Sequence, residues 1–189
     1  MVPIQYQKMK MTIDNWGGMF LNTFIEKSLK ALQSRLDSEN SLVIQREEGY
    51  IYNVEFEFNS PTSIEEINRF TEKTGWHLPD DYKEFLLLHN GAHLFSDVKY
   101  GGGYKLLALD EIHQEYVEYL DDVPKNWYPI SIDNGDYIFI DSSKVEDGKK
   151  DYLIRFQADE PVEYALKLNM NFETWLDKLI VCQGLEFWL

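Results

Sequence analysis

Two histidines of this sequence, His89 and His93, have the spacing of a metal-binding pair. Imidazole groups four residues apart lie on one face of a helix, as they do in many zinc sites. The intervening Asn90-Gly91 is expected to end a helix, however, and no glutamate follows His89 as the zinc-protease motif requires. The pair therefore favours a structural or solvent-facing role, and we expect no metal site in this chain.

Carboxylate pairs occur at Asp80-Asp81, at Asp121-Asp122 and in the turn at residues 133–136, which reads Asp-Asn-Gly-Asp. General acid–base catalysis and calcium binding both need carboxylates that converge on one point. The short turn lacks the further ligands and the distal glutamate of a calcium loop. Capping of helices, turn formation and solvation account for these residues without catalysis.

Three other patterns lack the partners that their chemistry needs. Gly101-Gly102-Gly103 is not followed by the Lys-Ser or Lys-Thr of a phosphate-binding loop. Cys182, the single cysteine, lies beside Val181 and Leu185, as a packing residue does, and no G-x-S-x-G sequence supplies a serine nucleophile. We expect no catalytic residue and no cofactor, and we keep a carboxylate-dependent hydrolase as the least favoured alternative.

The charge of the chain bounds the classes of partner. Its 189 residues have a formal net charge of −15 and a pI near 4.6. A field of that sign repels nucleic-acid phosphates and anionic lipid, so we expect neither nucleic acid nor membrane as a partner. It attracts a basic protein, although solubility alone also explains an acidic composition. Aromatic residues make up 15% of the chain, which is too much for a disordered protein.

After catalytic, metal and phosphate sites are set aside, the function that the sequence still favours is binding of a protein partner through the surface. The segment 110–123 places apolar residues on one side of a helix and acidic residues, without lysine or arginine, on the other. Large aromatic residues next to charge are typical of binding hot spots. The expected contact residues are Trp76, Tyr100, Tyr104, Glu111, Glu115, Glu118, Asp121, Asp122 and Trp127.

Two short helices are predicted in the centre of the chain. In the first, Thr62 and Glu65 fit a capping box, and Gly75 fits the left-handed end of the helix. A Leu-Pro step follows, after which Asp80 is expected to cap a second helix that Asn90-Gly91 terminates.

Residues 1–60 are predicted to form a helix and a β-hairpin that extend the same domain as residues 61–189. Asn15 or Asp14 can cap an amphipathic helix of about five turns that runs to Leu36. We expect this helix to pack on its own domain, although a helix that binds another chain would show the same pattern.

Strands outnumber helices in the middle of the chain, and helices gather at its two ends. Asn134-Gly135 favours a type I′ turn in a hairpin. This order predicts an α+β fold: one domain with an antiparallel or mixed β-sheet, flanked by N-terminal and C-terminal helices. The predicted strands are residues 42–45, 50–58, 105–109, 152–157 and 162–166 and the hairpin 127–141, and the further helices are 110–123 and 171–180.

Three blocks of the sequence together resemble the SUKH superfamily. The first is the helix–Leu-Pro–helix segment, the second is the hairpin WYPISIDNGDYIFIDSS, and the third is a Phe-x-x-Trp-Leu pattern in the final helix. The resemblance covers about residues 61–181. The matching residues, expected to be structural, are Leu78, Pro79, Asp80, Tyr82, Phe85, Leu86, Asn90, Gly91, Gly135, Asp136, Asp141 and Trp175.

The resemblance implies a protein-binding function. Bacterial members of the superfamily mostly serve as immunity proteins against polymorphic toxins, and fungal members include regulators of cell-wall synthesis. It therefore implies either direct binding of a cognate toxin domain, for which a basic nuclease suits the charge, or a regulatory or scaffolding module with a cellular partner. One cysteine and no secretion signal or membrane-length apolar run lead us to expect a cytoplasmic protein. The oligomeric state does not follow from the sequence.

Overall fold

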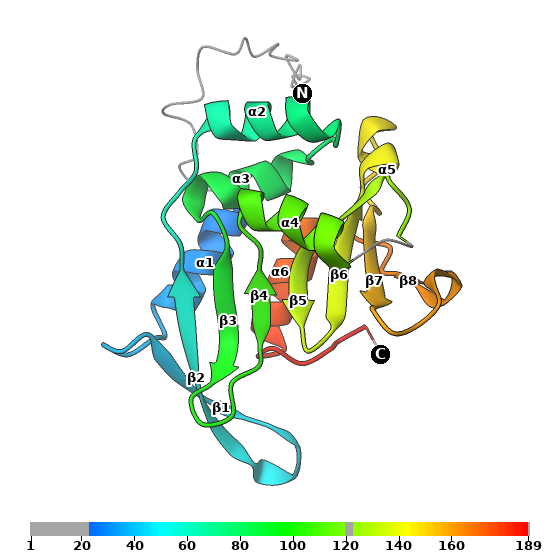
Figure 1. Ribbon diagram of the computed structural model, residues 1–189. Helices are drawn as coiled ribbons and strands as arrows, with labels where there is room; N and C mark the ends of the chain where they lie inside the picture. Colours follow the sequence, from blue (N-terminus) through cyan, green and yellow to red (C-terminus); the bar gives the residue numbers. More distant parts are fainter. Residues whose placement is uncertain (1–22, 120–122, 189) are drawn as a thin grey trace, which may run out of the picture.

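In the part of the chain that the structure describes, eight antiparallel β-strands, joined in sequence order, form one sheet (Figure 1). The computed structural model describes residues 23–119 and 123–188, without the side chains of Glu118 and Tyr119. The α+β fold is confirmed, and every strand pair of the described residues is antiparallel. The strands are β1 (Ser41–Gln45), β2 (Ile51–Phe58), β3 (Ala92–Asp97), β4 (Tyr104–Leu106), β5 (Trp127–Asp133), β6 (Asp136–Asp141), β7 (Leu153–Gln157) and β8 (Leu166–Lys167).

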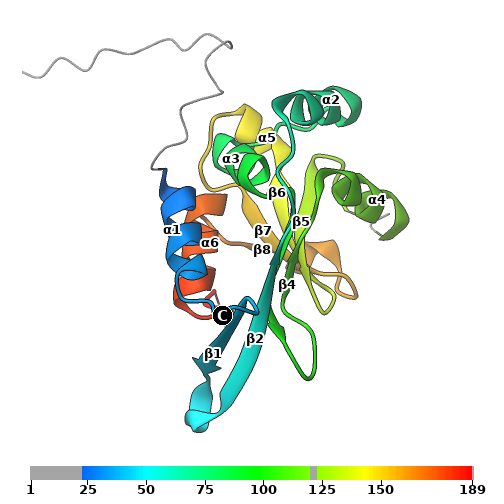
Figure 2. The ribbon, with the colours of Figure 1, turned by 90° about the vertical axis from the view of Figure 1, so that its left-hand side faces the viewer.

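The helices gather in three places around this sheet. Figure 2 shows α1 and α6 side by side on one face of the sheet and α4 on the opposite face, with α2, α3 and α5 at one end. No helix of the described residues is long and apolar enough to cross a lipid bilayer. The helices are α1 (Phe24–Gln33), α2 (Ile64–Thr74), α3 (Asp80–Leu88), α4 (Leu109–Tyr119), α5 (Ser142–Glu146) and α6 (Phe172–Val181).

The N-terminal helix packs on its own domain, as expected. Ile25, Leu29 and Leu32 of α1 are buried, and the helix contacts α6 and α3. Thr23 caps it by accepting a hydrogen bond from the Glu26 amide at 3.3 Å. The caps predicted at Asn15 and Asp14 lie outside the described residues.

The capping box of α2 lies one residue later than predicted. Ser63, not Thr62, accepts a hydrogen bond from the Glu66 amide, and the Glu66 carboxylate accepts one from the Ser63 amide at 2.9 Å. Thr62 is instead buried, and its amide donates to the Leu86 carbonyl, so its backbone serves the contact between α2 and α3. Gly75 ends the helix with φ of 74°, as predicted.

The cap of α3 also differs from the prediction. Pro79 holds the N-cap position, and Asp80 is the first helical residue, paired with Lys83 at 3.3 Å. Asp81 supplies the stronger polar contact, because its carboxylate accepts hydrogen bonds from the Tyr152 hydroxyl and from the Glu173 amide. This carboxylate joins the start of α3 to the start of α6.

One strand that the sequence predicts in the C-terminal part of the chain, residues 162–166, is mostly not formed. Residues 162–164 form a 3-10 turn in which the Tyr164 amide donates to the Pro161 carbonyl at 3.0 Å, and only Leu166 and Lys167 form β8. The hairpin β5–β6 is confirmed, with positive φ at both Asn134 and Gly135 as a type I′ turn requires.

The residues that match the family pattern either pack in the core or connect neighbouring elements through caps, turns and ion pairs. Leu78, Tyr82, Phe85, Leu86 and Trp175 are in the main core, between the sheet and the helices α1, α3 and α6. Asn90 accepts a hydrogen bond from the Leu109 amide at the start of α4, and Asp141 caps α5. A Cβ at Gly91 would lie 2.9 Å from the Leu106 carbonyl oxygen, so only glycine fits without movement. Asp136 pairs with Arg155 at 2.7 Å beside Gly135.

Candidate protein-binding face

Two aromatic residues predicted at the partner surface are buried, so that prediction of exposure is wrong. Trp76 has 6% of its surface exposed and Tyr104 has 4%. The Trp76 indole stacks on Tyr128 at 5.1 Å and donates to the Lys125 carbonyl, which satisfies its N–H without water. Tyr104 packs edge-on against Trp175. Sequence position near a loop does not distinguish such residues from surface anchors.

The two other predicted aromatic contacts differ in exposure. Tyr100 is 74% exposed at the turn between β3 and β4, where the Lys99 ammonium lies 4.8 Å from its ring centre. Trp127 is half-buried and leans on Phe139 in a second apolar cluster beneath α4. Tyr100 therefore remains available to a partner, and Trp127 is available only in part.

The acidic side of α4 is partly used within the protein. Glu111 pairs with Lys105 at 2.6 Å and accepts a hydrogen bond from the Ala108 amide at 2.9 Å. Glu115 accepts a hydrogen bond from the Tyr137 hydroxyl at 2.6 Å. Asp121, Asp122 and the side chain of Glu118 lie outside the described residues.

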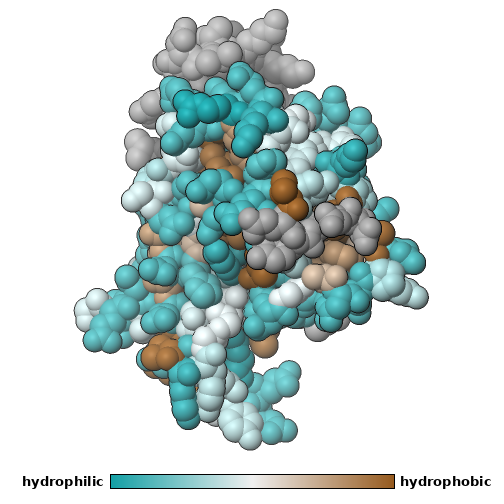
Figure 3. Space-filling view, in the orientation of Figure 1, coloured by the Kyte–Doolittle hydropathy of each residue, from teal (hydrophilic) through white to brown (hydrophobic). Residues whose placement is uncertain are grey.

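A more exposed surface, which the sequence patterns do not predict, is the part of the sheet that α4 leaves uncovered (Figure 2). The alternating residues Val54 and Phe56 are buried toward α1 and α6, so the intervening residues of β2 point to the opposite side. We call this the open sheet face; its exposed and half-exposed side chains are Val43, Ile51, Glu55, Glu57 and His93, and Ser96 is buried beside them. Figure 3 looks onto it, and in the region of the β1–β2 hairpin a hydrophobic patch lies beside hydrophilic side chains and side chains of intermediate hydropathy.

A groove of about 280 Å³ runs across one end of the open sheet face. Its carboxylates come from Glu55 and Glu57 on β2 and from Glu39 in the turn before β1, and His93 lies on β3. None of the three carboxylates forms a salt bridge with a lysine or arginine of residues 23–119 and 123–188. We call this the acidic groove. Its chemistry suits the ammonium or guanidinium group of a partner.

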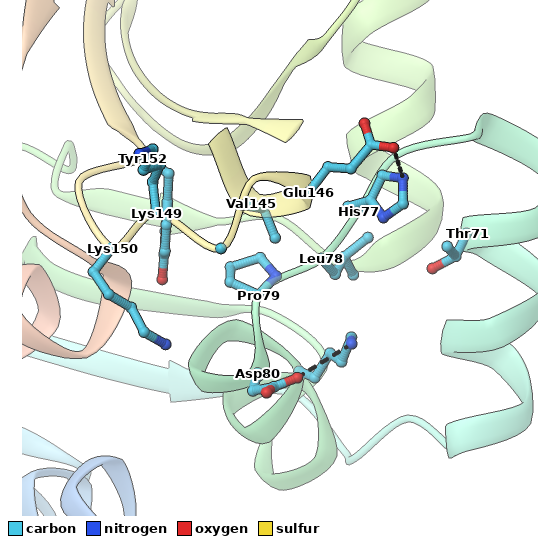
Figure 4. A pocket seen from close by; sticks show the side chains of 12 residues that line it. Thr71, His77, Leu78, Pro79, Asp80, Val145, Glu146, Lys149, Lys150 and Tyr152 are labelled. Carbon is cyan, nitrogen blue, oxygen red and sulfur yellow. Dashed lines mark hydrogen bonds and ion pairs between the residues drawn. The ribbon is translucent and has the colours of Figure 1, made fainter. Parts of the chain in front are cut away.

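A second cavity, of about 400 Å³, lies at the Leu78-Pro79 step (Figure 4). Lysines border it on two sides, but its charges are mixed, because Lys83 pairs with Asp80 at 3.3 Å and His77 lies 3.8 Å from the Glu146 carboxylate. Exposed pairs of this kind contribute little free energy. The cavity therefore does not present one sign of charge to a ligand.

Carboxyl groups with raised pKa values do not coincide with these hollows. Burial raises the pKa of Glu84 on α3 and that of Asp133 at the end of β5 above their usual values. Neither residue lines the acidic groove or the cavity at the Leu-Pro step. Within the described residues, no group of three or more His, Cys, Asp or Glu side chains is arranged to hold a metal ion.

Comparison with known proteins places these features in a family. The model of the SMI1/KNR4 family (SUKH-1) matches residues 61–178, which is more than half of the chain. The uncharacterized protein YobM of Bacillus subtilis (strain 168) is 33% identical over 176 residues, which cover 89% of this chain and 92% of YobM. Such coverage includes part of the first sixty residues. The uncharacterized protein YnaB of the same organism is 36% identical over 134 residues, which cover 70% of this chain and 86% of YnaB. The chain therefore belongs to the SMI1/KNR4 (SUKH-1) family.

Proposed function

We propose that this protein is a cytoplasmic immunity protein that neutralises a cognate toxin domain by binding to it, and that it transforms no substrate itself. Membership of the SUKH-1 family supports this proposal. Bacterial proteins of the SUKH superfamily mostly serve as immunity proteins. The net charge of −15 supports a basic partner. Many toxin domains that act on DNA or RNA are basic, as binding to phosphates requires.

The acidic groove is the observation that carries the proposal. Glu39, Glu55 and Glu57 are held on strands and on a tight turn rather than on long loops, and no described cation neutralises them. Fixed carboxylates of one sign attract a basic surface over several ångströms, which raises the rate of encounter, and they then form charge-assisted hydrogen bonds in the complex. A toxin active site that binds nucleic acid would present the matching positive charge.

The proposal is tested by identifying a toxin domain encoded by a neighbouring gene and co-expressing it with this protein. We expect the wild-type protein to restore growth of cells that express the toxin. The double substitution Glu55→Lys/Glu57→Lys should abolish rescue, because it reverses the charge of the groove. The control Glu65→Lys/Glu72→Lys changes the net charge equally on α2 and should still rescue, since both residues are exposed and remote from the groove.

A regulatory or scaffolding module with a cellular partner is the alternative, and it would use the same open sheet face. Failure of the wild-type protein to rescue cells from the adjacent toxin would overturn the immunity proposal. Capture of a cellular protein by the wild type but not by the Glu55→Lys/Glu57→Lys variant would then favour the alternative. Turnover of a substrate by the purified protein would overturn both.

A further inference from the structure

The outer edge of β1 is a sheet edge that the described residues protect only at Ser41. β1 and β8 are the end strands of the sheet; β8 has two residues, whereas β1 has five, with the sequence SLVIQ. Natural edge strands are protected by short length, charged residues, proline or bulges, because unpaired backbone groups invite another strand. The five residues of β1 include no charged residue and no proline, and their pairing with β2 is regular.

Hydrogen bonds at the two ends of the hairpin show which backbone groups of β1 point outward. The Arg46 amide donates to the Tyr50 carbonyl at 2.8 Å, and the Asn40 carbonyl accepts from the Phe56 amide at 3.0 Å. The backbone groups of even-numbered residues therefore face β2, and those of odd-numbered residues face away from it. The outward-facing residues of β1 are Ser41, Val43 and Gln45.

One of these three residues already has partners, and two do not. Asp37 closes the edge at Ser41, because its carboxylate accepts from the Ser41 amide at 2.9 Å and its own amide donates to the Ser41 carbonyl at 3.0 Å. The outward amide and carbonyl of Val43 and of Gln45 have no hydrogen-bond partner among the described residues. Two donors and two acceptors are thus spaced as the ladder of an added strand requires.

The side chains beside this edge indicate which side chains an added strand would need. Val43 is 66% exposed and Ile51 is 63% exposed, so an apolar side chain placed over them would be covered on one side. The acidic groove begins at Glu39 and Asn40, immediately before β1, and continues to Glu55 on the neighbouring strand. A strand on β1 would therefore pass from an apolar patch to unpaired carboxylates.

We propose that the β1 edge binds an extended, lysine- or arginine-bearing segment of the protein partner as a ninth strand of the sheet. The segment exchanges backbone hydrogen bonds with Val43 and Gln45, covers Val43 with an apolar side chain and places a basic side chain in the acidic groove. This inference rests on the proposed function and deepens it, because it names the edge through which a partner is held. Main-chain hydrogen bonds of this kind supply affinity, and the side chains supply specificity.

The first test uses a synthetic ten-residue peptide of alternating lysine and valine, with glutamate in place of lysine as the control. Amide hydrogen exchange of the full-length protein is followed by NMR. We expect the lysine peptide to slow exchange of the Val43 and Gln45 amides, and the glutamate peptide to leave it unchanged. No binding of the lysine peptide, binding without protection of these two amides, or equal protection by both peptides would overturn the proposal.

Exchange in the protein without peptide tests other occupants of the edge. Protection of Val43 and Gln45 that increases with protein concentration would identify a second copy as the occupant. Protection independent of concentration would identify a segment of the same chain, such as residues 1–22. Either result would overturn the proposal of a basic segment from a partner, whereas fast exchange of both amides in the free protein supports it.

Substitutions at Val43 separate backbone from side-chain binding. Val43→Pro removes the outward amide donor, replaces the valine side chain and leaves the hydrogen bonds to β2 in place, whereas Val43→Ala keeps that donor and removes side-chain atoms. One hydrogen bond corresponds to about a fivefold change in affinity. Val43→Ala should weaken peptide binding through the lost apolar contact alone, and Val43→Pro should weaken it about fivefold more through the lost hydrogen bond. Equal affinities of the two variants would contradict strand addition. Thermal unfolding checks that Val43→Pro is folded. If this variant does not fold, hydrogen exchange of the wild-type protein with the two peptides still tests the proposal.

The co-expression assay distinguishes failure of this inference from failure of the proposed function. If wild-type protein and Val43→Pro both rescue cells from the adjacent toxin equally, the β1 edge is not the binding element, and the immunity function stands. If wild-type protein does not rescue, the proposed function fails, and peptide protection of Val43 and Gln45 then decides the edge on its own. Loss of rescue in Val43→Pro with retention in Val43→Ala supports both.

Discussion

Gly103 is the residue at which the backbone of this fold leaves the least room. Its φ is +84°, and a Cβ at this position would lie 2.6 Å from the Leu94 carbonyl oxygen and 2.7 Å from that of Phe95. Phe95 itself has φ of 60°, at the irregular step where β3 shifts register against β2. The positions of two backbone carbonyls therefore depend on the absence of a side chain at Gly103.

We expect Gly103→Ala to lower the free energy of unfolding by about 3 kcal/mol, the sum of an unfavourable φ and a clash with backbone atoms that cannot rotate away. Gly101→Ala is the matched control: its φ is +71°, but nothing lies within 4 Å of the added Cβ. That variant should lose about 1 kcal/mol. Urea unfolding of both proteins measures the difference, and equal losses would show that the close approach at Gly103 relaxes.

Glu84 gives the protein a pH-dependent contribution to stability. Burial raises the pKa of this carboxyl above its usual value, against the lowering effect of the hydrogen bond from the Thr23 hydroxyl. The folded form therefore holds the proton more tightly than the unfolded chain. Stability from this group is complete below the unfolded pKa and is lost as the pH rises through the folded pKa.

Glu84→Gln should accordingly raise the free energy of unfolding at pH 7, and by less at pH 4, because the carboxyl that it replaces is ionised at pH 7 and largely protonated at pH 4. The glutamine carbonyl oxygen still accepts the Thr23 hydroxyl, so the contact between α1 and α3 is kept. Glu72→Gln, on the exposed side of α2, serves as control and should change stability little at either pH. Urea unfolding at the two pH values gives both differences; a larger gain at pH 4 would contradict the assigned sign.

At the scale of elements, a single hydroxyl joins two helices to the sheet. The Tyr152 hydroxyl, just before β7, donates to the Asp81 carboxylate of α3 at 2.6 Å and accepts from the Phe172 amide of α6 at 3.0 Å. Burial and the neighbouring Asp81 carboxylate raise the pKa of Tyr152 well above its usual value, so the phenol remains a donor. The first turns of α3 and α6 are therefore held together by hydrogen bonds to the same Tyr152 hydroxyl.

Tyr152→Phe should destabilise the protein by about 2 kcal/mol, because it leaves the buried Phe172 amide and the half-buried Asp81 carboxylate each without one partner. Tyr164→Phe, at a site that is exposed, is the control and should stay within about 0.5 kcal/mol of the wild type. Chemical denaturation monitored by tryptophan fluorescence compares them. A loss no larger than that of the control would show that other groups or water replace the Tyr152 hydroxyl.

Local patterns predicted most of the elements that hold these contacts. Alternation in residues 50–58 and the Gly75 stop led to the correct strand and helix, because period and backbone conformation are local properties. The capping box was placed one residue early because Thr62 and Ser63 are chemically alike, and only the contact with Leu86 separates them. Residues 162–166 fit one strand by composition, which does not reveal the turn hydrogen bonds that follow Pro161.

The candidate site was much less predictable, for a reason that belongs to the whole molecule. Sequence identifies which residues of β2 share a face, but not which of the two faces a helix covers. α1 and α6 cover one face, and α4 covers only part of the other, so Glu55 and Glu57 are left on an open surface. The same packing buries Trp76 and Tyr104. Exposure of a side chain depends on contacts between distant elements, and these have no local signature.

The arrangement of charge leads to a prediction about association with the partner. The acidic groove lies within a chain of net charge −15, so both the overall field and the local carboxylates attract a basic surface. Salt screens interactions between exposed charges beyond about 10 Å at 0.1 M and leaves desolvated contacts largely intact. Electrostatic steering should therefore appear in the association rate, while the dissociation rate should reflect hydrogen bonds and apolar contacts.

We expect the association rate with the purified toxin domain to fall about tenfold between about 50 mM and about 500 mM salt, with a much smaller change in dissociation. Glu55→Gln/Glu57→Gln should reduce both the rate at low salt and its salt dependence. Glu65→Gln/Glu72→Gln removes the same net charge from α2 and should have less effect, because steering acts through charges near the contact. Stopped-flow fluorescence measures these rates. An affinity that is the same at low and high salt would rule out steering, and equal effects of the two double variants would move the contact away from the acidic groove.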